Sequence, residues 1–145
     1  MVKLFLRAAP ALLLLSSCAA SLETRPFYAT CHVLGSSGWA ARMEIVPANR
    51  SKKPTMLRKL VVTGRVTLAG EGLAVSLERG PLARLDEPIQ QVFVRTDGTP
   101  DPAAAPVTRT VQGVFAGRKH YGGVEIRCGD GIIGEIREVA PAPAR

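Results

Sequence analysis

Aromatic residues, histidines and cysteines are all scarce in this chain. Phe, Trp and Tyr together make up 5% of the 145 residues, and the chain has two histidines and three cysteines. It lacks the alternation of Lys or Arg with aromatic side chains on which nucleic-acid bases stack. Although the chain is basic, its composition therefore predicts no nucleic-acid partner.

The motifs of common hydrolases and metal sites are missing as well. No Cys-x-x-Cys, Gly-x-Ser-x-Gly, Ser-x-x-Lys or His-Glu-x-x-His occurs. The two histidines, His32 and His120, are interpreted as surface or strand-edge residues. Glu125 and Glu135 would approach each other across the last predicted hairpin, but a glycosidase pair also needs a cleft. We expect a protein that is not an enzyme, with no catalytic residue, no metal and no cofactor.

Long apolar runs are missing too. The chain begins with a short apolar run. This run extends to Leu15, is broken by Pro10, and begins with the basic residues Lys3 and Arg7. A bilayer core of about 30 Å needs roughly 20 apolar residues. Residues 1–17 are therefore predicted to be a cleaved export signal rather than a membrane span.

The end of this signal, Leu15 to Cys18, resembles the lipobox of bacterial lipoproteins. The resemblance implies cleavage before Cys18, lipidation of its sulfur and attachment to a membrane through that lipid. Because Ala19 rather than Asp follows, it further implies the outer membrane, on its periplasmic face. Residues 18–26 would then form a tether. The alternative is ordinary cleavage before Ser21, which would release a soluble periplasmic or secreted protein.

Two cysteines remain once Cys18 is assigned to the lipid. In an oxidising compartment Cys31 and Cys128 are expected to form one structural disulfide. Such a bridge would close nearly the whole domain, and the loop-entropy model gives about 4.7 kcal/mol for a loop near 100 residues. A redox or metal-binding cysteine is the alternative. It has little support, because no Cys-x-x-Cys and no histidine at ligand spacing is present.

Side chains alternate between apolar and polar through most of the chain after Pro26. Short segments of this kind, separated by Gly, Pro and Asp turns, predict an all-β sandwich or barrel. Gly35 to Gly38 is expected to be a turn, and Cys128 to Gly131 a tight hairpin. Residues 27–139 are predicted to form one β-domain and residues 140–145 a flexible tail. The expected strands lie at 27–33, 39–45, 60–68, 73–78, 89–95, 107–115, 120–128 and 132–139.

Cys31, Trp39 and Cys128 resemble the Cys…Trp…Cys signature of immunoglobulin domains. The match departs from that family in two ways. The spacings differ, and Ile126 stands where the family has its corner tyrosine. The resemblance implies an immunoglobulin-like β-sandwich of about seven to eight strands with one disulfide and a different connectivity.

From Gly38 onward the chain also resembles a group of small exported bacterial proteins of unknown function. The similar segments are Trp39 to Ala41, Leu60 to Val66 and Val124 to Gly129. Each is a short β-type motif, and together they span most of the mature domain. The resemblance implies a single secreted β-domain and brings no activity, ligand or catalytic residue.

Basic residues gather in the first third of the predicted domain. Removing the signal leaves 17 Lys and Arg against 12 Asp and Glu, a net charge of +5. One interpretation is a solvated loop that protects a sheet edge. The other is a contact patch for lipid head groups, lipopolysaccharide phosphates, acidic glycans or acidic proteins. The residues, accompanied only by Glu44, are Arg42, Arg50, Lys52, Lys53, Arg58, Lys59 and Arg65.

The sequence thus favours a lipid-anchored cell-envelope protein that acts through its surface as a binding or structural module. A second hypothesis is an inhibitor or chaperone that engages an exported enzyme or subunit through a loop or sheet edge. A hydrolase is a third, with no triad or metal set to support it.

Overall fold

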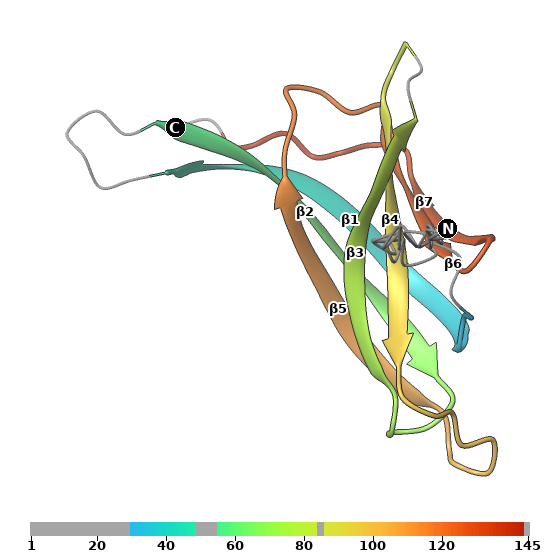
Figure 1. The fold of residues 1–145 in the computed structure, drawn as a ribbon. Coiled ribbons are helices and arrows are strands. Elements are labelled where there is room, and N and C mark those ends of the chain that lie inside the picture. The colour runs from blue at the N-terminus through green and yellow to red at the C-terminus, as the bar shows by residue number, and fades with distance from the viewer. Residues whose placement is uncertain (1–29, 49–54, 84–85, 144–145) are drawn as a thin grey trace, which may run out of the picture.

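The computed structural model describes residues 30–48, 55–83 and 86–143. No helix lies within these residues, and the strands form a three-stranded sheet and a four-stranded sheet (Figure 1). The all-β prediction is confirmed. The strands are β1 (Val33–Pro47), β2 (Met56–Leu68), β3 (Ala74–Ala83), β4 (Ile89–Asp97), β5 (Val107–Ala116), β6 (Gly123–Cys128) and β7 (Gly131–Ile136).

The first sheet has the order β1-β2-β5 and the second the order β3-β4-β6-β7. Every neighbouring pair is antiparallel except β4 and β6, which are parallel. The sheets touch where β1 meets β7 and where β3 meets β5. A continuous hydrophobic core contains buried residues from both sheets.

The strand β2 shows how the sequence produces this arrangement. Its side chains alternate, and Leu60, Val62, Val66 and Leu68 are all fully buried in the core. Burying a Val or Leu side chain contributes about 1.5–3 kcal/mol. Shifting this strand by one residue would turn all four side chains outward, so its register is strongly determined.

The predicted turn at Gly35 to Gly38 is wrong. The structure has one continuous strand from Val33 to Pro47, whose register shifts beside Gly35 and again after Ser37. Gly38 has a φ of 64°, a conformation that glycine adopts without steric cost. The extra residues are therefore absorbed as bulges inside a long strand, which bend it without ending it.

Trp39 joins the two sheets. Its ring lies against Gly64 of β2 and Gly134 of β7, and a side chain at either glycine would overlap the ring. Its indole N–H donates to Ser36 Oγ at 3.1 Å, and that hydroxyl donates to the carbonyl of Ile133 at 2.7 Å. The indole is thus held between the sheets with its polar atom satisfied, as a partly buried Trp requires.

The predicted disulfide is confirmed. Cys31 and Cys128 are bonded, with their Cα atoms 5.3 Å apart. Cys31 precedes β1 of the first sheet and Cys128 ends β6 of the second, so the bond links them. The predicted hairpin follows at once, because Cys128 pairs with Gly131 and Gly129 has a φ of 61°. Glycine at the first turn position suits the type II′ geometry of two-residue hairpins.

The chain ends differ from the predicted boundaries. The strand expected at 120–128 begins at Gly123, and the one expected at 132–139 ends at Ile136. Ala140, the first residue of the expected tail, forms a parallel bridge to β1. Its N–H donates to the carbonyl of Ala41 at 3.0 Å, and its carbonyl accepts from Met43 N–H at 2.8 Å. This short segment covers part of the outer edge of β1.

Candidate anion-binding face

The outer face of the three-stranded sheet holds most of the described residues of the predicted basic patch. Residues paired across antiparallel strands share a face. Arg42 pairs with buried Val61, Lys59 pairs with Glu44 and Ala116, and Arg65 pairs with Ser37. Alternation from the core residues places these three cations on the face turned away from the core.

Arg58 lies on the opposite face. It pairs with Ile45 of β1, which shares a face with Met43 and Ala41 of the core. The structure therefore brings three of the predicted cations together and separates the fourth. The other predicted patch residues, Arg50, Lys52 and Lys53, and the predicted lipidation residue Cys18 lie outside the described residues.

Glu44 is the one carboxylate that the described residues place on this outer face. It accepts hydrogen bonds from Arg42 Nε at 3.1 Å and from Arg42 Nη2 at 2.9 Å. Both side chains are substantially exposed, so the pair contributes no more than about 1 kcal/mol. Among the described residues, neither Lys59 nor Arg65 has a side-chain hydrogen bond or ion pair. The face keeps two cations available to an external anion.

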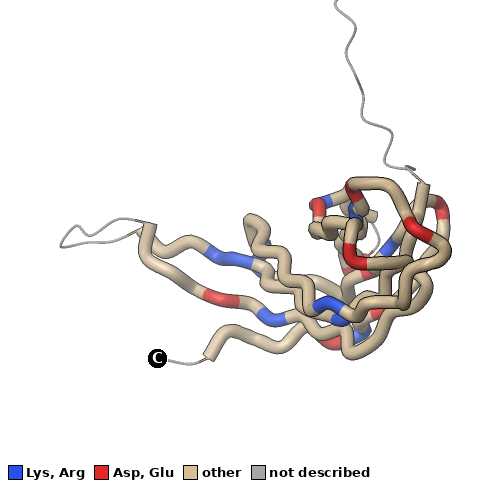
Figure 2. Tube along the Cα trace, turned by 90° about the horizontal axis from the view of Figure 1, so that it is seen from below, with Lys and Arg blue, Asp and Glu red and all other residues tan. Residues whose placement is uncertain are grey.

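The strands β1 and β2 continue beyond β5 as a two-stranded arm (residues 45–47 and 56–58). β5 ends at Ala116, opposite Lys59, and Gly117 N–H makes a last hydrogen bond to the Arg58 carbonyl at 2.7 Å. Figure 1 shows the arm as the curved ribbon that leaves the body of the molecule. Figure 2 shows basic residues beside this arm and most of the acidic residues toward the far end.

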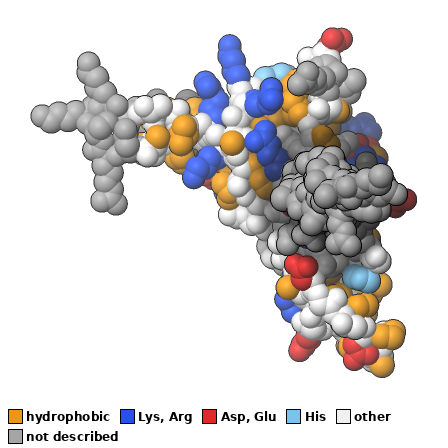
Figure 3. Space-filling view, viewed as in Figure 1, with side chains coloured by type: hydrophobic (Ala, Val, Ile, Leu, Met, Phe, Trp, Pro, Cys, Tyr) orange, Lys and Arg blue, Asp and Glu red, His pale blue; other side chains and the backbone are white. Residues whose placement is uncertain are grey.

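Exposed apolar side chains concentrate on and beside the arm. Ile45, Met56, Leu57 and Val114 are 38%, 40%, 46% and 48% exposed. In Figure 3 hydrophobic and basic side chains lie side by side over this part of the molecule. A surface of this kind is typical of sites that contact a partner or a membrane.

A groove of about 480 Å³ lies where β5 ends alongside β2. Leu57, Lys59, Val114 and Ala116 belong to the outer face of the sheet, by the pairing of Lys59 with Ala116. Four lining residues are apolar, two are cationic and none is acidic. The lining is Leu57, Arg58, Lys59, Val114, Phe115 and Ala116.

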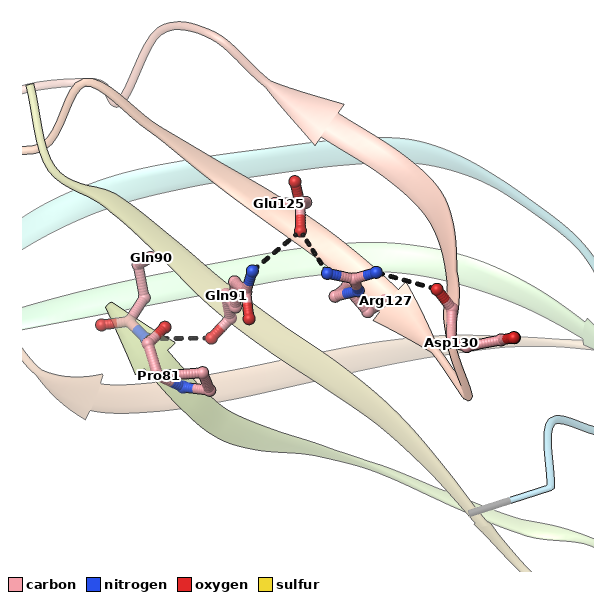
Figure 4. A network of polar contacts seen from close by, with 6 residues as sticks. All are labelled: Pro81, Gln90, Gln91, Glu125, Arg127 and Asp130. Carbon is pink, nitrogen blue, oxygen red and sulfur yellow. Dashed lines mark hydrogen bonds and ion pairs between the residues drawn. The ribbon is translucent and has the colours of Figure 1, made fainter. Parts of the chain in front are cut away.

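The outer face of the four-stranded sheet is different, because its charges are paired with each other. Glu125 accepts hydrogen bonds from Gln91 Nε2 and Arg127 Nη1, both at 3.2 Å (Figure 4). Arg127 also donates to the Asp130 carbonyl at 2.8 Å. Glu125 pairs with Glu135 across the β6–β7 hairpin, as the sequence suggests. Because the Glu125 carboxylate accepts both of these hydrogen bonds, we interpret its role as structural.

Beside this network, Phe93 is almost fully buried although it points away from the core. The guanidinium of Arg95 lies 5.6 Å from the centre of its ring, and Arg95 Nε donates to Glu78 Oε2 at 2.7 Å. Cation–π contact and ion pair together cover the ring. Most charged groups of this face are therefore paired with one another, although Arg127 Nε is buried without a hydrogen-bond partner among the described residues.

His120 lines a second, smaller pocket of about 290 Å³ together with Tyr121 and residues of both charges. The Tyr121 hydroxyl accepts a hydrogen bond from the Arg118 backbone N–H at 3.1 Å. No Ser, Thr or Cys lines this pocket. His32 is half-buried beside the disulfide.

Sequence reasoning missed the groove and the exposed apolar residues around it. Met56 and Leu57 directly precede Arg58, and this apolar pair next to a basic pair was the available signal. The groove itself depends on where β5 ends relative to β2, which local alternation does not determine.

No family model, curated protein or solved structure matches this chain. Over the described residues, no helix is long and apolar enough to cross a membrane. The same residues contain no group of three or more His, Cys, Asp or Glu side chains placed to hold a metal ion.

Proposed function

We propose that this protein is a non-catalytic binding module of the bacterial cell envelope. Lipidated Cys18 holds it at the outer membrane, and the outer face of the β1-β2-β5 sheet contacts phosphate-bearing lipid head groups. The supporting observation is that Arg42, Lys59 and Arg65 share this face with one described carboxylate, Glu44. Basic residues near an anionic leaflet contribute about 1 kcal/mol each.

The proposed anchor makes a modest patch sufficient. A tether confines the domain to the membrane surface, so the second contact forms at a high effective concentration. Two or three exposed cations bind only weakly in free solution, and the tether makes this weak contact sufficient to orient the domain on the surface. In this proposal the chain belongs with the small exported bacterial proteins that its sequence resembles.

Vesicle binding tests the patch. The exported chain carrying Cys18→Ser removes the proposed lipid, so that partition onto vesicles reports the patch alone. Combining Lys59→Gln with Arg65→Gln should lower partition onto phosphatidylglycerol-containing vesicles roughly thirtyfold, at about 1 kcal/mol per charge. Raising salt from 0.1 M to 1 M should weaken wild-type binding, because the Debye length falls from about 10 Å to 3 Å.

Arg137→Gln is the matched control. Its side chain is 91% exposed and follows β7 of the other sheet, so the substitution removes the same charge from a different surface. Equal losses in the control and in a single Lys59→Gln variant would mean that net charge alone drives binding. That result would overturn the patch.

The anchor has its own test. Cys18→Ser in the wild-type background should abolish acyl labelling and move the protein from the membrane fraction to the soluble fraction. A wild type that is already soluble, with Ser21 as its mature N-terminus, would contradict the anchor and support the secreted alternative.

The arm favours a second candidate function, an inhibitor or chaperone of an exported enzyme or subunit. Exposed apolar residues on a projecting hairpin, such as Met56 and Leu57, are suited to enter a partner's groove. A photo-crosslinker at either position would recover one exported protein reproducibly. The same crosslinker at Ile132, on β7, would not.

We further propose that the two sheets form an immunoglobulin-like sandwich. Support comes from sheets of three and four strands, from the disulfide between them and from Trp39 between β2 and β7. The parallel pairing of β4 with β6 differs from the antiparallel sheets of that fold. The connectivity would therefore be a variant of it.

A further inference from the structure

The groove beside the arm is lined by both apolar and cationic side chains, and this combination restricts which ligands can bind there. Leu57, Val114, Phe115 and Ala116 provide an apolar wall, while Arg58 and Lys59 provide positive charge at one strand. Its volume of about 480 Å³ falls within the range of about 300–1,000 Å³ that small-molecule sites occupy. No carboxylate lines it, so the charge it presents is of one sign.

We propose that this groove binds the hydrocarbon chain of a single anionic amphiphile of the fatty-acid class. The chain lies over Leu57, Val114 and Ala116, which share the outer face of the sheet with Lys59. The anionic head lies at the Lys59 ammonium, which has no ion pair among the described residues. The proposal deepens the proposed function, because it assigns an individual ligand to the same face.

Charge complementarity selects this occupant over others. A cationic or neutral amphiphile would leave the two lining cations, Arg58 and Lys59, with no counter-charge. An acidic peptide without apolar side chains would satisfy the charge, but it would leave the exposed surface of Leu57 and Val114 in water. An anionic amphiphile satisfies both, since apolar burial and a charge-assisted contact occur in one molecule.

Titration with dodecanoate below its critical micelle concentration tests the proposal. Calorimetry on the exported Cys18→Ser chain should show saturable binding of one dodecanoate. Acetate, which lacks the chain, and dodecyltrimethylammonium, which has the opposite charge, should bind far more weakly. Amide NMR shifts should change at residues 57–59 and 114–116.

Three variants test the two parts of the site. Val114→Asp and Leu57→Asp should each weaken dodecanoate binding at least about tenfold, because each removes apolar contact and also places a carboxylate near the anionic head. Lys59→Glu should weaken dodecanoate roughly fivefold and strengthen dodecyltrimethylammonium. This exchange of preference is a readout that a structural defect would not produce. Leu57 lies on the arm outside the core, so its variant stays informative if Val114→Asp disturbs Val61 beneath it.

Ile132→Asp is the matched control, because Ile132 is 49% exposed and Val114 is 48% exposed. It lies on β7 and should leave dodecanoate binding unchanged. Arg65, which does not line the groove, distinguishes the inference from the proposed function. Arg65→Gln should reduce vesicle partition and spare dodecanoate binding.

Several outcomes would overturn the inference. These are the absence of monomeric dodecanoate binding, equal loss in the Ile132→Asp control, or no exchange of preference in Lys59→Glu. If vesicle binding depends on Leu57 and Val114 but monomeric dodecanoate does not bind, the groove is a membrane contact and not a ligand site. If dodecanoate binds while vesicles do not, the proposed function fails and this inference stands.

Discussion

The two sheets of this molecule treat charge on their outer faces in opposite ways. On the four-stranded sheet, Glu125 is shared by Gln91 and Arg127 within a connected layer. On the three-stranded sheet, Lys59 and Arg65 have no side-chain partner among the described residues. Charged side chains that pair with one another stabilise the fold and attract an external ligand only weakly. Unpaired cations attract an anionic partner more strongly.

The largest expected effect concerns the bond that holds both sheets together. Replacing Cys31 and Cys128 with Ser should lower the free energy of unfolding by about 4–5 kcal/mol, because the loop-entropy model assigns about 4.7 kcal/mol to a loop near 100 residues and the cysteines are 97 residues apart. Urea unfolding of the oxidised, reduced and double-Ser proteins would measure it. An unchanged midpoint in the reduced protein would show that the sheets need no covalent link.

The next effect concerns the indole between the sheets. Gly64→Ala and Gly134→Ala should each cost about 1–3 kcal/mol, the usual cost of overpacking, because each new methyl group would overlap the Trp39 ring. Gly35→Ala is the matched control, since a Cβ there meets no atom within 4 Å. Thermal unfolding monitored by Trp39 fluorescence reports all three. Equal destabilisation by the control would indicate a backbone effect instead of a clash.

The comparison between the faces is sharpened by one substitution on each. Glu125→Gln removes the charge that pairs with Arg127, whose side chain is 21% exposed, and should cost about 1–3 kcal/mol of stability. Arg65→Gln should change stability by less than about 0.5 kcal/mol, as an exposed surface position does. In vesicle partition the order should be reversed, with Arg65→Gln lowering binding more than Glu125→Gln. If Arg65→Gln destabilises more than Glu125→Gln, the contrast between the faces is wrong.

The sequence predicted the features that local alternation and simple counting determine. The alternation of Leu60, Val62, Val66 and Leu68 places them in the core because the side-chain period of a strand is two. The disulfide could be predicted because two cysteines remained after Cys18 was assigned to the lipid. The expectations that no cofactor and no metal is needed stay predictions.

Features that depend on contacts distant in sequence could not be predicted. The parallel pairing of β4 with β6 joins residues more than thirty positions apart along the chain. The burial of Phe93 on an outer face depends on Arg95 and on the missing side chain at Gly80. The split between Lys59 and Arg58 follows from strand geometry, but it becomes visible only once β2 is known to include both residues. A run of basic residues in the sequence therefore overestimates how many cations share one face of the fold.

Mapping the bound surface residue by residue tests the central claim most directly. Amide NMR spectra of the exported Cys18→Ser chain would be recorded with bicelles that contain phosphatidylglycerol and with neutral bicelles. The account predicts perturbations at Arg42, Lys59 and Arg65, only in the anionic case, and none around Glu125 and Arg127. Perturbations centred on the four-stranded sheet, or equal ones with neutral bicelles, would contradict it.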